Sequence, residues 1–247
     1  MSTAPRQRRS WTRAVMGTQV SLHLRGHRVD TDPAVEPAVA AVFGHLRTAD
    51  ELFSTYRPDS QVSAIRRDEL PRDRWHPWVT EVVALCEEAR ERTDGYFDPW
   101  RLPGGFDPSG LVKGWAVENA AAHLARLCGY DHYLNAGGDI AARVHTARAP
   151  AWRVGVEDPG DPAAFLAVLD LRTGGLATSG TAARGAHIVD PHTGRHTSNL
   201  LSVTVTGPTL LWADVFATAA FARGGNVTRW ITALAPGYEV AALARAP

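Results

Sequence analysis

One lysine stands alone in the chain, and glycines surround it. Lys113 is the only lysine among 26 Lys and Arg residues, so arginine serves wherever a generic cation is needed. A lone lysine therefore indicates a site that requires a compact, flexible ammonium instead of a planar guanidinium. Residues 107–115 are typical of a loop that enters a helix N-terminus, where backbone amides bind phosphate. The alternative is a surface lysine on an ordinary first turn, and composition leaves both interpretations open.

A carboxylate and a hydroxyl lie one helical turn apart in a helix predicted over 208–222. The spacing of Asp214 and Thr218 places both oxygens on the same helix face. Hard oxygen ligands suit Mg²⁺, which takes few protein ligands and completes its coordination with water and substrate phosphates. Zinc is disfavoured because no Cys or His pair stands nearby. In the alternative, which the spacing alone favours, Thr218 bonds its own helix and Asp214 is exposed.

A histidine and two small-residue segments are further candidates. His187 is predicted between two turns, where it could donate to a phosphate or accept a proton from a hydroxyl. With 10 histidines in the chain, a surface or packing role is the more common alternative. The segments 137–139 and 178–180 are compatible with ligand contact or with simple turns. The chain has neither the P-loop motif nor the dinucleotide-binding glycine motif.

Hydrophobic periodicity predicts the elements that must position these residues. Strands are expected over 18–24, 133–140 with a central glycine turn, 152–157, 165–171, 200–206 and 237–243. Helices are expected over 33–53, 77–93, 111–128, 208–222 and 226–234. The helices come early, and the strands come late and are joined as hairpins. The pattern therefore predicts an α+β fold with antiparallel sheet.

Properties of the whole chain argue against several functional classes. Its 26 basic and 26 acidic residues give a formal net charge of zero, which disfavours broad binding to nucleic acid or membrane surfaces. We expect no membrane anchor and no secretory signal, because no apolar run is long enough for either. Residues 1–11 are predicted to be disordered, and 12–247 to form a single domain. Cys86 and Cys128 are predicted to be reduced core residues, as in a cytoplasmic protein.

Short motifs in a fixed order extend over nearly the whole chain. They lie at 16–18, 54–63, 93–99, 107–114, 135–139, 152–159, 177–180, 187–194 and 202–219. Together they resemble the ApbE family, the FAD:protein FMN transferases. Nine motifs in the same order are a far more specific signal than any single motif. The resemblance implies an ApbE-like α+β fold, in which antiparallel sheets are flanked by helices.

The resemblance also implies a substrate, a reaction and a site. Members of the family bind FAD, use Mg²⁺ and transfer FMN to a threonine hydroxyl of a target protein, releasing AMP. Asp214 and Thr218 match the family's metal ligands, with the backbone carbonyl of Gly110 as a third. His187 matches the histidine near the diphosphate. The threonine hydroxyl also needs a base, and His187 or a site aspartate could serve; we favour His187, with Asp214 as the second catalytic residue. The positions that match the FAD site are Met16, Tyr56, Tyr96, Phe97, Asp98, Asp107, Lys113, His187 and Ile188.

The chain departs from the family pattern in two places. Many relatives are exported lipoproteins or are anchored to a membrane, whereas this sequence shows no signal and no lipid-accepting cysteine, so we expect a cytoplasmic enzyme. The connection over 99–107 is shorter than the usual one, which normally helps to wall the site. The short connection therefore leaves the mode of target recognition open.

Three functional hypotheses follow from the residues and the resemblance. The leading one is a Mg²⁺-dependent transferase that attaches FMN to a threonine of a partner protein. In the second, water replaces the threonine and the protein is an FAD diphosphatase that releases FMN and AMP. The third is a flavin-binding protein without turnover. The pair formed by Asp214 and Thr218 argues against the third, because holding a flavin requires no metal ligands.

Overall fold

An antiparallel sheet of seven strands forms the centre of the fold. The computed structural model describes residues 7–102, 104–181, 188–196 and 199–245. Within them the sheet has the strand order β1-β2-β3-β4-β7-β8-β9, and β5 pairs only with β6 in a separate ribbon. The strands are β1 Gln7–Val15, β2 Thr18–Gly26, β3 Asp131–Ala136, β4 Asp139–Arg143, β5 Trp152–Asp158, β6 Asp161–Leu171, β7 Thr173–Gly180, β8 Leu200–Gly207 and β9 Glu239–Arg245.

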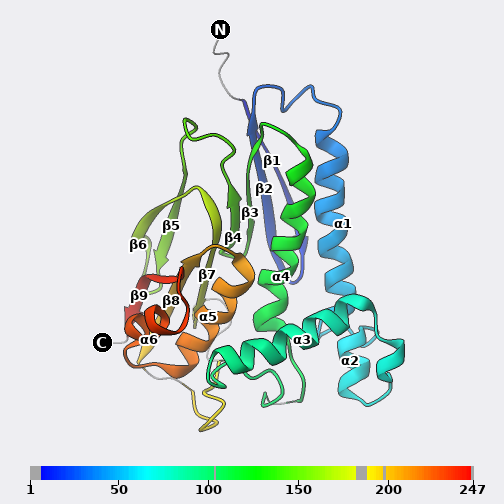
Figure 1. Cartoon of the computed structure of the whole chain (residues 1–247), viewed down its shortest axis with the longest axis vertical. Helices are drawn as coiled ribbons and strands as arrows, with labels where there is room; N and C mark the ends of the chain where they lie inside the picture. The colour runs from blue at the N-terminus through cyan, green and yellow to red at the C-terminus, as the bar shows by residue number, and fades with distance from the viewer. Residues whose placement is uncertain (1–6, 103, 182–187, 197–198, 246–247) are drawn as a thin grey trace.

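Helices cover one face of the large sheet. The helices α1 Val35–Phe53, α4 Ser109–Ala122 and α5 Leu210–Arg223 pack on the strands, and α6 Val227–Leu234 packs on α5 and β9. The helix α2 Gln61–Arg66 contacts α1, α3 Pro77–Arg92 contacts α4, and the 3₁₀ turns are η1 Arg72–Arg74 and η2 His123–Arg126. Figure 1 shows α1 and α4 side by side along β1, β2 and β3, and α5 beside β7. This arrangement brings the first turns of α4 against α5.

Local sequence signals account for several helix ends. Proline stands at the first position of α3, and the His76 ring Nδ1 accepts a hydrogen bond from the backbone N–H of Trp78. The helix α3 is followed by Gly95, which has a positive φ of 77°. Asn226 caps α6 by accepting from the N–H of Arg229.

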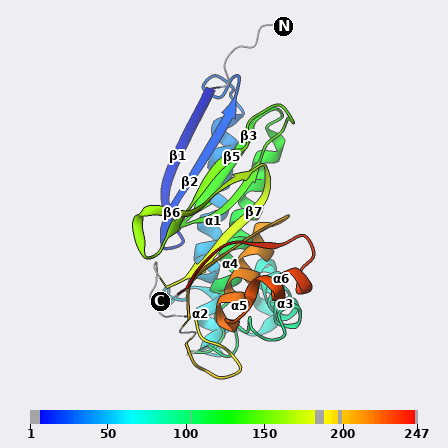
Figure 2. The ribbon, with the colours of Figure 1, turned by 90° about the vertical axis from the view of Figure 1, so that its left-hand side faces the viewer.

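The strands β4 and β7 are buried on both faces. Ala141 and Ala177 pack into the main core under the helices. Ile140 and Leu176 pack instead into a second apolar cluster beneath the β5–β6 ribbon. Figure 2 shows this ribbon in front of the large sheet, with α1 behind it. The sheet is therefore the middle layer of a three-layer structure at this point.

The structure confirms the predicted α+β class with antiparallel sheet and flanking helices. The predicted disorder over 1–11 is wrong for residues 7–11, because β1 pairs along its whole length with β2. Edge-strand pairing is made by backbone groups, and β1 has too few buried side chains to show a period-2 pattern. Cys86 is buried as predicted, whereas Cys128 is exposed. Among the described residues, none of the helices combines the length and the apolar character needed to cross a bilayer.

Candidate functional site

The N-terminus of α4 is capped by a carboxylate of the preceding loop. Asp107 Oδ1 accepts a hydrogen bond from the backbone N–H of Ser109 at 3.0 Å and another from the Ser109 hydroxyl. The capped turn places Gly110, Lys113 and Gly114 in the first turns of the helix. Asp107 thus occupies one of the terminal amides of α4, which leaves fewer of them for another anion.

Two glycines let α4 approach α5 closely. A Cβ atom at position 114 would lie 2.9 Å from the Asp214 Cβ and 3.0 Å from the Leu210 carbonyl oxygen. A Cβ atom at position 110 would lie 3.1 Å from the Phe97 ring and 3.4 Å from the Thr218 Cγ2. Glycine spacing on α4 therefore matches the spacing of Asp214 and Thr218 on α5.

Asp214 is buried in this helix crossing. The residue is only 2% exposed, and its Oδ2 accepts a hydrogen bond of 3.0 Å from the backbone N–H of Gly114. The Thr218 hydroxyl lies 3.0 Å from the Ser179 hydroxyl on β7. The alternative arrangement, with Asp214 exposed, is therefore not the one that the structure adopts.

A capping interaction fixes α5 relative to α4. The Glu118 carboxylate of α4 accepts a hydrogen bond of 2.8 Å from the backbone N–H of Leu211, at the start of α5. Burial raises the pKa of Glu118 above its ordinary value. The Thr209 side chain makes no capping bond at this helix end, so a residue of the neighbouring helix supplies the cap.

Lys113 forms an ion pair with a buried carboxylate. Its ammonium contacts Asp139 Oδ2, and the side chains are 22% and 1% exposed. Asp139 is the first residue of β4, and its Oδ1 accepts from the backbone N–H of Thr178 at 3.2 Å. The lone lysine is therefore not a surface residue of an ordinary helical turn.

The β1–β2 and β3–β4 turns lie together at one end of the sheet. Met16 and Gly17 form the first turn, both with positive φ, and Met16 is half-buried against the main core. A Cβ atom at Gly137 would lie 2.6 Å from the Thr18 hydroxyl oxygen, so the second turn has no room for a side chain there. Met16 is thereby brought to the sheet end at which Asp139 and Lys113 meet.

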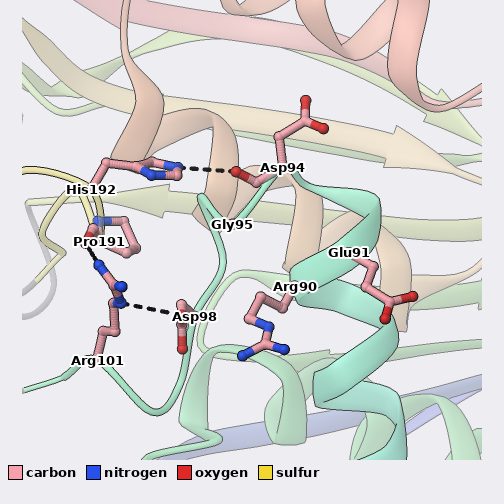
Figure 3. Close-up of a pocket in the computed structure, with 8 residues that line it drawn as sticks. All are labelled: Arg90, Glu91, Asp94, Gly95, Asp98, Arg101, Pro191 and His192. Carbon is pink, nitrogen blue, oxygen red and sulfur yellow. Dashed lines mark hydrogen bonds and ion pairs between the residues drawn. The ribbon is translucent and has the colours of Figure 1, made fainter.

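The segment 94–101 forms one wall of a pocket of about 390 Å³. Figure 3 shows its lining residues, which are Arg90, Glu91, Asp94, Gly95, Asp98, Arg101, Pro191 and His192. His192 Nε2 lies 3.0 Å from the Asp94 carbonyl oxygen, and Arg101 donates to the Pro191 carbonyl oxygen at 3.2 Å. The turn that follows Ile188 is thus attached to the segment that carries Tyr96 and Phe97.

The aromatic residues of the predicted FAD site differ widely in exposure. Phe97 is buried against Gly110, and the Tyr96 ring meets the His192 ring edge-on at 4.7 Å. Tyr56, in the loop after α1, is 93% exposed and is the most exposed of the large hydrophobic residues described. Its ring is therefore available to a ligand or partner.

The predicted metal ligands would offer oxygen atoms of three kinds. Asp214 carries a carboxylate, Thr218 a hydroxyl and Gly110 a backbone carbonyl in the first turn of α4. Within the described residues, no group of three His, Cys, Asp or Glu side chains lies close enough together to hold a metal ion. A set with few carboxylates and no soft ligand fits Mg²⁺ better than a transition metal.

The model of the ApbE family matches residues 16–105 and 101–242, which together are most of the chain. The chain belongs to the ApbE family.

Curated relatives in this family carry a common name. The FAD:protein FMN transferase of Salmonella typhimurium is 39% identical over 119 residues, covering 42% of this chain and 34% of that protein. The FAD:protein FMN transferase of Haemophilus influenzae is 32% identical over 129 residues, covering 48% of this chain and 37% of that protein. The matched segment therefore spans only about a third of the length of the relatives.

Solved ApbE structures share the whole fold. The ApbE protein from Thermotoga maritima has a TM-score of 0.82 at 20% identity and covers 97% of each chain. The flavin transferase ApbE from Vibrio cholerae has a TM-score of 0.80 at 20% identity, covering 96% of this chain and 97% of that one. The likeness confirms the ApbE-like fold that the sequence motifs predicted.

The structure of this ApbE-family chain brings most of the predicted site residues to neighbouring elements. Gly110 faces both Phe97 and Thr218, and Asp214 contacts the residue after Lys113. Asp98 lines the pocket, and the Tyr96 ring contacts the His192 ring that also lines it. Ile188 packs against the main core just before the turn that carries His192, and Asp107 caps α4. His187 lies outside the described residues.

Sequence reasoning missed several residues that hold the site together. Asp139, Gly114, Ser179 and His192 contact predicted site residues, although none was itself assigned a role. Two of them had a usable signal. Gly110 and Gly114 repeat the spacing of Asp214 and Thr218, and Asp139 directly follows a pair of glycines.

Proposed function

We propose that the protein is a Mg²⁺-dependent FAD:protein FMN transferase, which attaches FMN to a threonine hydroxyl of a target protein and releases AMP. The observation that carries this proposal is the position of Asp214. Its carboxylate is buried at the α4–α5 crossing, one helical turn from Thr218 and next to the helix turn that bears Lys113. Family membership and the names of the curated relatives support the same reaction.

The proposed metal ligands are Gly110, Asp214 and Thr218. Mg²⁺ held by these oxygens would supply positive charge that stabilises the diphosphate as its bridging bond breaks. Asp214 is oriented for this role by the Gly114 N–H, which binds one of its carboxylate oxygens. Thr218 is oriented by the Ser179 hydroxyl. Residues of α4 and β7 thus hold both side chains in place.

The remaining predicted residues would bind and orient FAD. The Lys113 ammonium adds positive charge beside the diphosphate, where the leaving AMP gains negative charge. Tyr56 offers an exposed ring for stacking on the ligand, and Met16, Tyr96, Phe97, Asp98, Asp107 and Ile188 are proposed to line the remainder of the site. The contact between the His192 ring and the Asp94 carbonyl oxygen would keep the turn after Ile188 next to the segment that carries Tyr96 and Phe97.

The proposed reaction is one displacement at phosphorus. The threonine oxygen of the acceptor forms a bond to the FMN phosphorus, and the bond from that phosphorus to the bridging oxygen breaks. AMP leaves with the electron pair of that bond. The hydroxyl proton passes to His187, which we propose as the general base because a histidine can accept a proton near neutral pH.

A direct assay separates this proposal from its two alternatives. The purified chain is incubated with FAD and Mg²⁺, with or without a threonine-containing acceptor peptide, and AMP is quantified. We expect AMP only when the peptide is present, together with flavin fluorescence that stays on the peptide under denaturing conditions. AMP release without any peptide would instead indicate an FAD diphosphatase. Binding of FAD without AMP in either sample would leave only a flavin-binding protein.

A further inference from the structure

Asp139 is a buried carboxylate to which neither the motifs nor the proposed reaction assigns a role. It is 0% exposed at the first position of β4. One oxygen forms the ion pair with Lys113, and the other accepts from the Thr178 N–H at 3.2 Å. Removing a carboxylate from water is costly unless a cation and hydrogen-bond donors compensate for the lost hydration. The fold supplies both kinds of partner at this position.

The contacts of Asp139 reach the two elements that hold the proposed metal ligands. Lys113 directly precedes Gly114, whose N–H binds Asp214. Thr178 directly precedes Ser179, whose hydroxyl lies 3.0 Å from that of Thr218. Asp139 therefore contacts both α4 and β7. On each element, the residue that it contacts directly precedes the residue that orients a proposed metal ligand.

A lysine that stabilises developing charge needs a partner that holds its ammonium in place. Its ammonium is a point charge on a long flexible stem, so an unheld side chain samples many positions. Charge stabilisation in a reaction depends on groups that are already in place when the charge develops. A carboxylate beside the ammonium holds it in position and also favours its charged form.

From this geometry we infer that Asp139 is a positioning residue, which holds the Lys113 ammonium at the junction of α4, β4 and β7 for the proposed transfer. Asp139 acts through Lys113 and does not touch the substrate. The inference rests on the proposed function, because it assigns Lys113 a task in the reaction. The ion pair itself can be tested without any activity.

The chain offers a matched control for the loss of a buried carboxylate. Asp131 is also 0% exposed, and its carboxylate pairs with Arg25 at 2.8 Å, near the opposite end of β3 from the Met16 turn. An Asp131→Asn variant therefore loses a comparable buried ion pair outside the proposed site. Any effect that is specific to the site should appear in Asp139→Asn and not in Asp131→Asn.

The first experiment is a double-mutant cycle on AMP release. Asparagine at 139 keeps an oxygen for the Thr178 N–H and removes the charge. We expect Asp139→Asn to lower kcat at least tenfold, Lys113→Met to lower it by at least as much, and the double variant to match Lys113→Met alone. Wild-type kcat in Asp139→Asn, multiplicative effects in the double variant, or an equal loss in Asp131→Asn would each overturn the inference.

The second experiment uses the fact that Lys113 is the only lysine in the sequence. Lysine-selective isotope labelling gives a single side-chain NMR signal, whose pH titration reports the pKa of Lys113. We expect this pKa to be lower in Asp139→Asn than in the wild type, because the variant loses the negative charge beside the ammonium. The Asp131→Asn titration should match the wild type.

The two experiments fail in different ways. A wild-type protein that releases no AMP under any condition refutes the proposed function, and the NMR titration still decides whether Asp139 holds Lys113. If Asp139→Asn does not fold, relaxation of the same Lys113 signal in the wild type decides, because it needs no variant. Relaxation typical of a freely moving lysine side chain would then overturn the inference.

Discussion

At the scale of single residues, Asp214 combines a structural contact with a proposed chemical role. Its carboxylate is buried and accepts a hydrogen bond from the first turns of α4. The same carboxylate is the only negatively charged member of the proposed ligand set. A substitution that keeps the hydrogen bond but removes the charge can therefore separate the two contributions.

We expect Asp214→Asn to lower Mg²⁺-dependent AMP release by at least about 100-fold, which corresponds to about 2.7 kcal/mol of transition-state stabilisation. The amide still offers an oxygen to the Gly114 N–H, so the fold should be retained. AMP release is measured against Mg²⁺ concentration, and folding by thermal unfolding. The matched control is Asp170→Asn, which removes an exposed carboxylate from β6 and should behave as the wild type. Unchanged Mg²⁺ dependence in Asp214→Asn would refute its assignment as a ligand.

At the scale of elements, the close crossing of α4 and α5 determines whether the proposed ligands can meet. Gly114 faces backbone atoms of Leu210 and Leu211 as well as the Asp214 side chain. Backbone atoms cannot move aside as the end of a flexible side chain can. A methyl group at 114 should therefore separate the helices, even though alanine is a better helix former than glycine.

We expect Gly114→Ala to lower the free energy of unfolding by about 1–3 kcal/mol, because overpacking outweighs the gain in helix propensity. AMP release should fall as well, since Asp214 is displaced. The control is Gly44→Ala in the middle of α1, where the nearest atom to the new methyl is the end of the Arg47 side chain at 3.8 Å. Denaturant unfolding should show Gly44→Ala to be unchanged or more stable by up to about 1 kcal/mol. Equal stability of the two variants would contradict this account of the crossing.

At the scale of the whole molecule, buried histidines link the stability of the fold to pH. His132 lies on β3 and is 7% exposed. Its pKa is lowered from 6.5 to about 4 by burial and by the nearby Arg143 and His145. The pKa of His45 is also lowered to about 4, by burial and by His123. Both rings are therefore uncharged in the folded protein near neutral pH.

The free energy of unfolding should fall as the pH drops from about 6.5 to about 4. In that range the unfolded chain binds protons that the folded His132 does not accept, so acid favours unfolding. The contribution of His132 is at most about 3 kcal/mol and is fully present above pH 6.5. His132→Gln should have a smaller loss of stability over this range, measured by denaturant unfolding at each pH. The exposed His27→Gln serves as the control, and equal pH dependence in both variants would contradict the prediction.

Much of the fold could be predicted because side-chain periodicity reports which face of an element is buried. The alternation over Leu200–Gly207 predicted β8, and the apolar spacing before Phe53 predicted α1. The polar edge strand β1 could not be predicted in this way. Its pairing with β2 depends on backbone hydrogen bonds, which leave no pattern in the side chains.

The amino-acid sequence by itself determined the α+β class, the common helix face of Asp214 and Thr218, and the resemblance to the ApbE family. These depend on local spacing and on the order of short motifs. Only the tertiary structure decided that Lys113 pairs with Asp139, that Ser179 contacts Thr218, and that Gly114 binds Asp214. Each of these contacts joins elements that are distant along the chain. They depend on strand register and helix crossing, which follow from the packing of the whole core and not from any single segment.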